Sequence, residues 1–227
     1  MSSIPANLQA VYARIARAAA ENGRDVNSIT LLAVSKTFPA GHVRECAETG
    51  QRCFGENYVQ EGVEKIAELR ELDLEWHFIG PIQSNKTRPI AEHFGWVHGI
   101  ERDKVARRLS EARPAGLPPL NVCIQVNVGG EASKSGVAPA AVLALAAAVS
   151  ALPRLKLRGL MAIPEPTPDR QLRRARFRSL RLIRDELAAH GHVLDTLSMG
   201  MSDDLEDAIA EGATLVRVGT AIFGARQ

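Results

Sequence analysis

The chain has 227 residues, of which 45% are hydrophobic and 24% are charged, a composition typical of a globular protein. Its formal net charge is only +2, with 28 basic and 26 acidic residues spread along the sequence. We therefore expect neither nucleic acid nor an anionic membrane as a partner, because both need a concentrated basic surface.

The three cysteines and the N-terminus indicate the compartment. Cys46, Cys53 and Cys123 form an odd set without CxxC spacing, so we expect buried free thiols in a reducing environment rather than disulfides or a metal site. The first 20 residues lack the basic segment and apolar core of a signal peptide and are typical of an amphipathic helix instead. Residues 139–152 are apolar but too short to span a bilayer. The sequence thus predicts a cytoplasmic protein.

After the N-terminal helix, short β-rich segments alternate with longer helical ones. We expect strands at Thr30–Lys36, Arg52–Glu56, Glu75–Gly80, Trp96–Ile100, Leu120–Val128, Leu155–Ile163, Val193–Met199 and Leu215–Phe223. Helical patterns fill the intervals, several of them closed by a glycine, at residues 40–50, 59–72, 85–95, 102–112, 139–152, 169–191 and 203–212.

This alternation predicts right-handed βαβ units and a parallel sheet. Eight units in this length favour a closed (β/α)₈ TIM barrel, whose usual size is about 250 residues, over a doubly wound open sheet. No linker or low-complexity segment divides the chain, so we expect a single domain over residues 1–227. Ligands of such a barrel bind at the carboxyl ends of its strands.

Lys36 is the most informative polar residue at a predicted strand end. It follows the buried segment "TLLAVS", on the side of the barrel that carries function. A partly desolvated amine has a lowered pKa and can attack a carbonyl to form a Schiff base, although a strand-end lysine can also extend into solvent. Lys156 lies at the opposite end of its strand. The remaining lysines have polar surroundings that predict solvated charges: Lys65, Lys86, Lys104 and Lys134.

The last predicted strand, "TLVRVGTAIFG", contains an arginine where both faces should be buried. Arg217 therefore needs an acceptor, either a structural carboxylate or a ligand. Gly219 and Thr220 follow it and can present backbone N–H groups and a hydroxyl to an anion. Ser198, Gly200 and Ser202 supply further small donors from the preceding loop.

Asp203 and Asp204 adjoin these donors and would repel a phosphate. We expect both carboxylates to turn away, with "DDLE" forming a helix cap that involves Glu206. An aldehyde-reactive lysine, a phosphate-binding loop and a cation for a ring nitrogen together predict pyridoxal 5′-phosphate (PLP) as the ligand.

Seven segments resemble the YggS/PROSC family of pyridoxal phosphate homeostasis proteins: "LLAVSKT", "FGENYVQEG", "WHFIGPIQSNK", "SKSG", "RGLMAIP", "LSMGMSDD" and "RVGTAIFGAR". The resemblance runs in order from about Leu31 to the C-terminus. It implies a single barrel like the N-terminal domain of alanine racemase, the fold-type III class of PLP proteins.

The resemblance also implies roles for individual residues. Lys36 would form the internal aldimine with PLP, and Arg217 would face the pyridine nitrogen. Asn57 and Met161 would line the ring. The phosphate would be bound by Ser198, Ser202, Gly219 and Thr220.

Members of this family are similar in acting on intracellular vitamin B6 balance without established catalytic turnover. We accordingly expect a PLP-binding homeostasis protein, monomeric, that can deliver PLP to apo forms of PLP-dependent enzymes. The alternative is a weak PLP-dependent amino-acid racemase. An arginine at the ring nitrogen weakens the ring as an electron sink, and a single barrel offers no second base of the kind that alanine racemases obtain from another domain.

Overall fold

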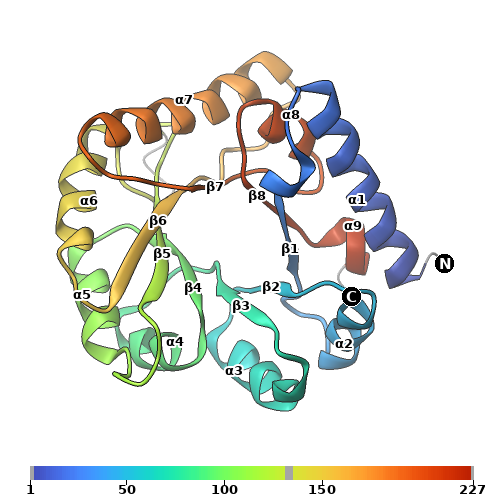
Figure 1. Cartoon of the computed structure of the whole chain (residues 1–227), viewed down its shortest axis with the longest axis horizontal. Helices are drawn as coiled ribbons and strands as arrows, with labels where there is room; N and C mark the ends of the chain where they lie inside the picture. The colour runs from blue at the N-terminus through green and yellow to red at the C-terminus, as the bar shows by residue number, and fades with distance from the viewer. Residues whose placement is uncertain (1–2, 131–134, 226–227) are drawn as a thin grey trace.

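Each strand pairs in parallel with the next strand in the sequence, and β8 pairs back onto β1 to close the sheet (Figure 1). The computed structural model describes residues 3–130 and 135–225. Its strands are β1 (Thr30–Val34), β2 (Cys53–Glu56), β3 (Glu75–Phe78), β4 (Trp96–Ile100), β5 (Leu120–Gln125), β6 (Leu155–Met161), β7 (Thr196–Ser198) and β8 (Leu215–Val218). The predicted eight-stranded parallel barrel is confirmed.

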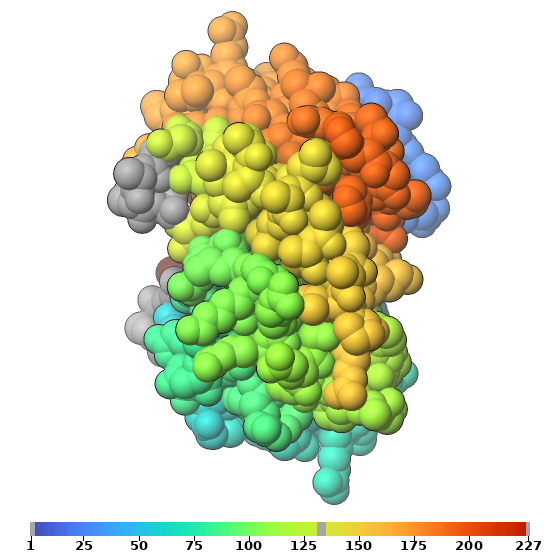
Figure 2. All heavy atoms as spheres, turned by 90° about the vertical axis from the view of Figure 1, so that its left-hand side faces the viewer, coloured from blue at the N-terminus to red at the C-terminus, as the bar shows by residue number. Residues whose placement is uncertain are grey.

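Helices surround this barrel. They are α1 (Ile4–Glu21), α2 (Ala40–Glu48), α3 (Val59–Glu68), α4 (Thr87–His93), α5 (Asp103–Ala112), α6 (Val142–Ser150), α7 (Arg170–Ala189), α8 (Leu205–Ala210) and α9 (Thr220–Phe223). Short 3₁₀ turns lie at Val26–Ser28, Arg70–Leu72, Ser84–Lys86 and Pro139–Ala141. Figure 2 shows side chains of α5, α6 and α7 covering one outer side of the barrel.

The N-terminal segment forms the expected amphipathic helix. The Ser3 hydroxyl accepts a hydrogen bond from the backbone N–H of Ala6 and caps α1. Leu8, Val11 and Ile15 are buried on one face of the helix, at the spacing that a period of 3.6 residues requires. This helix packs against α8 and α9, next to the loops that follow β7 and β8 (Figure 1).

Seven of the eight predicted strands were longer than the observed ones, and the seventh and eighth differ most. The eighth ends at Val218, because the backbone turns at Gly219 and the next four residues form α9. The seventh begins only at Thr196, and Val193 is 94% exposed in the preceding loop. Both segments have the apolar periodicity of a strand along their whole length. The observed strands end where neighbouring strands no longer offer backbone hydrogen bonds.

The barrel interior is unusually polar. Paired positions of neighbouring strands point to the same side of the sheet, and β1 pairs with β8 so that Leu32 lies beside Arg217. His77, His98 and Ser198 are also buried inside. In the part of the chain that the structure describes, no helix is long and apolar enough to cross a membrane.

Candidate functional site

A cavity of about 210 Å³ opens at the carboxyl ends of the strands. Residues from the ends of β1, β2, β3, β6, β7 and β8 line it: Val34, Lys36, Asn57, Ile79, Ile163, Met201, Ser202, Asp203, Arg217, Gly219 and Thr220. The structure therefore brings Lys36, the Arg217 guanidinium and the small donors of the last two loops into one cavity.

Lys36 is half-buried at the point where β1 gives way to a loop. The next residue, Thr37, has φ 69°, a left-handed conformation that β-branched residues rarely adopt and that costs about 1–3 kcal/mol. Its backbone N–H donates to Glu61 Oε1 at 2.6 Å. The strained turn redirects the chain immediately after the lysine, and surrounding contacts stabilise it.

The strongest of these contacts come from Lys65, which the sequence predicted to be a solvated charge. That prediction is wrong: Lys65 is only 5% exposed. Its Nζ donates to the Ser35 carbonyl at 2.7 Å, to Glu56 Oε1 at 2.7 Å and to Glu61 Oε1 at 2.6 Å. The Ser35 hydroxyl also donates to Glu56 Oε1 at 2.6 Å. A buried ion-pair network thus fixes the residue that precedes Lys36.

Arg217 lies at the base of the cavity and is 4% exposed. Its Nη1 donates to Ser198 Oγ at 2.7 Å and its Nη2 donates to the Ala162 carbonyl at 2.8 Å. Burial lowers the pKa of this guanidinium to about 10, despite the opposing charge of Asp204. Among the described residues no carboxylate forms an ion pair with it, so the buried cation can offer hydrogen bonds to a ligand acceptor.

A chain of hydrogen bonds runs from Arg217 along the barrel interior. Ser198 Oγ lies 2.9 Å from His98 Nδ1, His98 Nε2 lies 2.9 Å from His77 Nδ1, and His77 Nε2 lies 2.8 Å from Glu75 Oε1. Burial lowers the pKa of both imidazoles, so both are neutral near pH 7.

The direction of this chain follows from its two ends. Arg217 can only donate, and an ionised Glu75 can only accept. His77 Nε2–H therefore donates to Glu75, His98 Nε2–H donates to His77, and the Ser198 hydroxyl donates to His98 while accepting from Arg217. Each hydrogen bond in the chain thus has a defined donor and acceptor. The Ser198 oxygen at its end accepts from Arg217 Nη1 and so orients the guanidinium.

The loops after β7 and β8 meet through their hydroxyl groups. Thr220 Oγ1 donates to Ser202 Oγ at 3.1 Å, and the Ala221 backbone N–H donates to the same oxygen at 3.4 Å. A Cβ at Gly219 would lie 3.1 Å from the Val34 carbonyl, so glycine permits the close approach of β8 to β1 here. This arrangement concentrates donors that an anion can use.

Three other predicted residues do not line the cavity. Ser198 is fully buried behind Arg217. Met161 lies inside the barrel, packed with Trp96 and Cys123. Gly200 has φ 92° and its carbonyl accepts from the Arg217 backbone N–H, so it shapes the loop through its backbone.

We expected both aspartates to turn away from the cavity, and the structure shows this for only one of them. Asp204 does so, because its carboxylate accepts from the Met201 N–H at 2.6 Å. Asp203 instead lines the cavity. Glu206 does not complete a cap and binds Arg14 of α1 at 2.7 Å. Arg14 lies 192 positions away along the chain, so no local sequence pattern predicts that it binds Glu206.

Sequence reasoning included Asn57 among the site residues, but it did not reveal that its side-chain oxygen lacks a partner among the described residues, nor the hydrogen-bond chain behind Arg217. Asn57 Oδ1 is buried at the cavity without a hydrogen-bond partner among the described residues. The link of His77 and His98 to Arg217 depends on strand pairing, which local sequence does not reveal. Alternation of polar residues within β3 and β4 was the only available signal.

Comparisons with known proteins identify the family and the fold. A family model described as "Alanine racemase, N-terminal domain" matches residues 6–227. A protein of Pseudomonas aeruginosa named pyridoxal phosphate homeostasis protein is 65% identical over 226 residues, which cover 100% of this chain and 97% of that protein.

A protein of Escherichia coli K12 with the same name is 56% identical over 231 residues, covering 100% of this chain and 98% of that protein. Among solved structures, PipY of Synechococcus elongatus with PLP bound is 39% identical and superposes with a TM-score of 0.81. That match covers 93% of this chain and 100% of the PipY chain.

Proposed function

The chain belongs to the family of pyridoxal phosphate homeostasis proteins, and from this premise we propose that it binds PLP at the carboxyl ends of its strands and serves PLP homeostasis. The observation that carries the proposal is the convergence of Lys36, Arg217 and the Ser202–Thr220 hydroxyl pair on one cavity. None of these three groups alone would identify the ligand.

The chemistry of the cavity fits PLP at three separate points. Lys36 supplies an amine for the aldehyde, and Arg217 supplies a hydrogen-bond donor for the ring nitrogen. Ser202, Gly219 and Thr220 supply donors for the phosphate. Asn57 Oδ1, a buried acceptor without a partner among the described residues, is placed to receive a hydrogen bond from a ring substituent. When bound, PLP supplies an aldehyde that condenses with an amine as a Schiff base.

Ser198 has a different role in this proposal from that of the other serines. Its hydroxyl accepts from Arg217 and it is fully buried, so it positions the guanidinium instead of touching the phosphate. Met161 likewise packs inside the barrel against Trp96 and Cys123, so in this proposal it does not contact the PLP ring.

We propose a binding and carrier role without catalytic turnover. An arginine that donates to the ring nitrogen leaves that nitrogen unprotonated, because a guanidinium does not release its proton near neutral pH. An unprotonated ring nitrogen withdraws electrons weakly, which disfavours carbanion chemistry. A pocket with one covalent anchor suits reversible loading and release.

The racemase alternative has one structural candidate for a second acid or base. Among the described lining residues, Asp203 supplies a carboxylate, a group that can act as an acid or base in catalysis. Incubation of the PLP-loaded protein with L-alanine in deuterated water distinguishes the two functions. Multiple-turnover α-deuteration with racemisation, abolished by Asp203→Asn, would establish the enzyme and refute the carrier role.

The binding proposal itself is tested by spectroscopy. The purified protein with PLP is expected to absorb in the visible as a Schiff base, and borohydride reduction should leave the pyridoxyl group on Lys36. Lys36→Ala should abolish the visible band and keep the far-ultraviolet circular dichroism of the wild type. The exposed Lys86→Ala is the matched control and should keep the band. Reduction that labels another lysine would reject the assignment.

Delivery is tested by mixing the loaded protein with an apo PLP-dependent enzyme. Transfer faster than spontaneous release of PLP into a trapping agent supports a carrier that hands PLP over directly. Transfer at the release rate restricts the protein to buffering free PLP.

A further inference from the structure

A second cavity, of about 270 Å³, lies at the opposite end of the barrel, where the strands begin. Glu75, His77, Trp96, Arg158 and Asp195 contribute to its lining. Barrel ligands normally bind at the other end, so this cavity is independent of the proposed PLP site. We propose that a binding site for a zinc-class divalent ion lies at the edge of this cavity, with Cys53, Glu75 and His77 as its protein ligands, of which Glu75 and His77 line the cavity.

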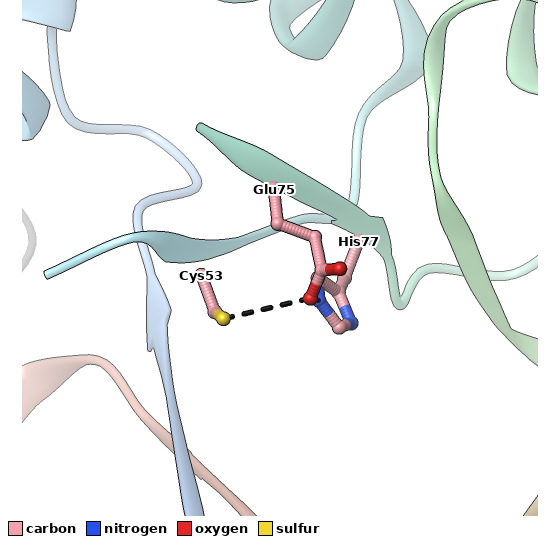
Figure 3. Close-up of side chains that lie close together, drawn as sticks. All are labelled: Cys53, Glu75 and His77. Atoms are coloured by element: carbon pink, nitrogen blue, oxygen red, sulfur yellow. Dashed lines mark hydrogen bonds and ion pairs between the residues drawn. The ribbon is translucent and has the colours of Figure 1, made fainter. Parts of the chain in front are cut away.

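Strand pairing brings these three residues together. Cys53 of β2 is the register partner of Glu75 of β3, and His77 follows Glu75 by two residues on the same face of the strand. Figure 3 shows the Cys53 thiol directed at the Glu75 carboxylate, with the His77 ring beside it. One ligand atom from each residue lies within 4.8 Å of the other two.

The distances are close to those of a tetrahedral zinc site. Bonds of about 2.3 Å to sulfur and about 2.0–2.2 Å to nitrogen and oxygen place sulfur and oxygen about 3.5 Å apart and nitrogen and oxygen about 3.3 Å apart. Cys53 Sγ lies 3.5 Å from Glu75 Oε1, and His77 Nε2 lies 2.8 Å from the same oxygen. The second pair must open by about 0.5 Å, and half-exposed Glu75 is free to make this adjustment.

The chemistry of the ligand set also favours zinc. A thiolate, an imidazole and a carboxylate are the three side-chain donors that zinc uses, whereas magnesium and calcium require oxygen ligands. Water from the cavity would complete the fourth position. The buried Trp96 indole N–H also lies beside the Glu75 carboxylate, to which it can donate when the ion is bound.

Arg158 also lines this cavity, but its positive charge repels a bound ion only weakly. Arg158 donates to both carboxylate oxygens of Asp195, with its shortest contact at 2.7 Å, and to Asn121 Oδ1 at 3.0 Å. Its guanidinium also lies 4.6 Å from the centre of the Trp96 ring. The charge of Arg158 is thus paired, and the carboxylate of Glu75 remains available to the metal.

A metal here would reverse the hydrogen-bond chain described above. Coordination through His77 Nε2 requires the proton on Nδ1, which would then donate to His98 Nε2. His98 would in turn donate from Nδ1 to Ser198 Oγ. An outer partner of this kind is typical of metal-bound histidines and raises affinity by about 10- to 100-fold.

Cobalt(II) is the probe for the test, because it takes tetrahedral zinc sites and reports thiolate ligation by a charge-transfer absorption. We expect one cobalt per chain, displaced by one zinc. Cys53→Ser should remove the charge-transfer band and weaken binding at least about 100-fold, and Glu75→Gln should weaken it without removing the band. Cys46→Ser, whose thiol is buried elsewhere, is the matched control and should bind as the wild type does.

The measurements are repeated in Lys36→Ala, because PLP can itself chelate metals. Equal binding in that variant locates the ion away from the PLP site and makes the result independent of the proposed function. Zinc should also switch His77 from the Nε2–H to the Nδ1–H tautomer, visible in ¹⁵N NMR of histidine. Cobalt binding that survives Cys53→Ser with its band intact, no stoichiometric binding, or an unchanged His77 tautomer would each overturn the proposal.

Discussion

The buried Lys65 network offers the sharpest test of how the scaffold holds Lys36. Replacing Lys65 with methionine keeps most of the buried aliphatic volume but leaves Glu56, which is 0% exposed, without its cation. Glu56 can then escape the cost of a buried charge only by binding a proton. We expect Lys65→Met to destabilise the protein mainly through this protonation.

The magnitude has an upper limit. Protonating a carboxyl group of ordinary pKa at pH 7 costs about 3.7 kcal/mol, since each pKa unit corresponds to about 1.4 kcal/mol. Burial already raises the pKa of Glu56 in the wild type, while Lys65 and Ser35 lower it. The cost of protonation is therefore smaller, and we expect a loss of about 2–3 kcal/mol in unfolding free energy.

The sign of the pH dependence follows from the same reasoning. Without Lys65, the folded-state pKa of Glu56 rises further above its unfolded value, so the penalty is present at neutral pH and disappears as the pH falls. The difference between wild type and Lys65→Met should shrink by about 1.4 kcal/mol per pH unit below pH 7, until the wild-type Glu56 also binds a proton.

Urea unfolding at several pH values, followed by circular dichroism, measures this difference. The exposed Lys86→Met should change stability by less than about 0.5 kcal/mol. Adding Glu56→Gln to Lys65→Met removes the buried charge and should recover much of the loss. A loss that is independent of pH, or that Glu56→Gln does not reduce, would refute the reasoning.

Two further predictions concern the packing around the barrel. Glu211 is buried under arginines of α7, and although burial raises its pKa, hydrogen bonds from Arg178 and Arg174 hold that pKa below its usual range. Glu211→Gln should cost about 1–2 kcal/mol at pH 7 in urea unfolding, and the two proteins should converge as the pH falls through the lowered folded-state pKa of Glu211, where the carboxylate contribution is lost. In Gly159→Ala, the added methyl would overlap the Thr196 carbonyl oxygen of β7, so thermal unfolding should shift down by several degrees or the protein should fail to fold. Gly116→Ala, with open space around it, is the control and should show neither effect, and a normal Gly159→Ala would contradict the close strand approach.

The order of elements was predictable because it depends on local patterns. Residues 30–34 and 96–100 are largely apolar over the length of one strand, and the long helix α7 begins at its own cap, Asp169. Boundaries were less predictable. The segment Leu215–Phe223 has strand periodicity throughout, but only Leu215–Val218 finds partners on β1 and β7.

The candidate site divides in a similar way. Lys36 and Arg217 stand out because a charge at a buried strand violates the local hydrophobic pattern, and parallel strands bring their carboxyl ends to one edge whatever the details of packing. By itself the sequence therefore determined the barrel and placed Lys36 and Arg217 at the strand ends where one cavity opens.

Only the tertiary structure decided the environment of those residues. Lys65 is a buried anchor and not a solvated charge, Ser198 supports Arg217 from behind, and Cys53 meets His77 across two strands. These contacts join residues that lie 9 to 30 positions apart along the chain. Which residues meet depends on strand register and side-chain direction. Local sequence patterns carry the periodicity of one element, whereas burial and pairing are properties of several elements packed together.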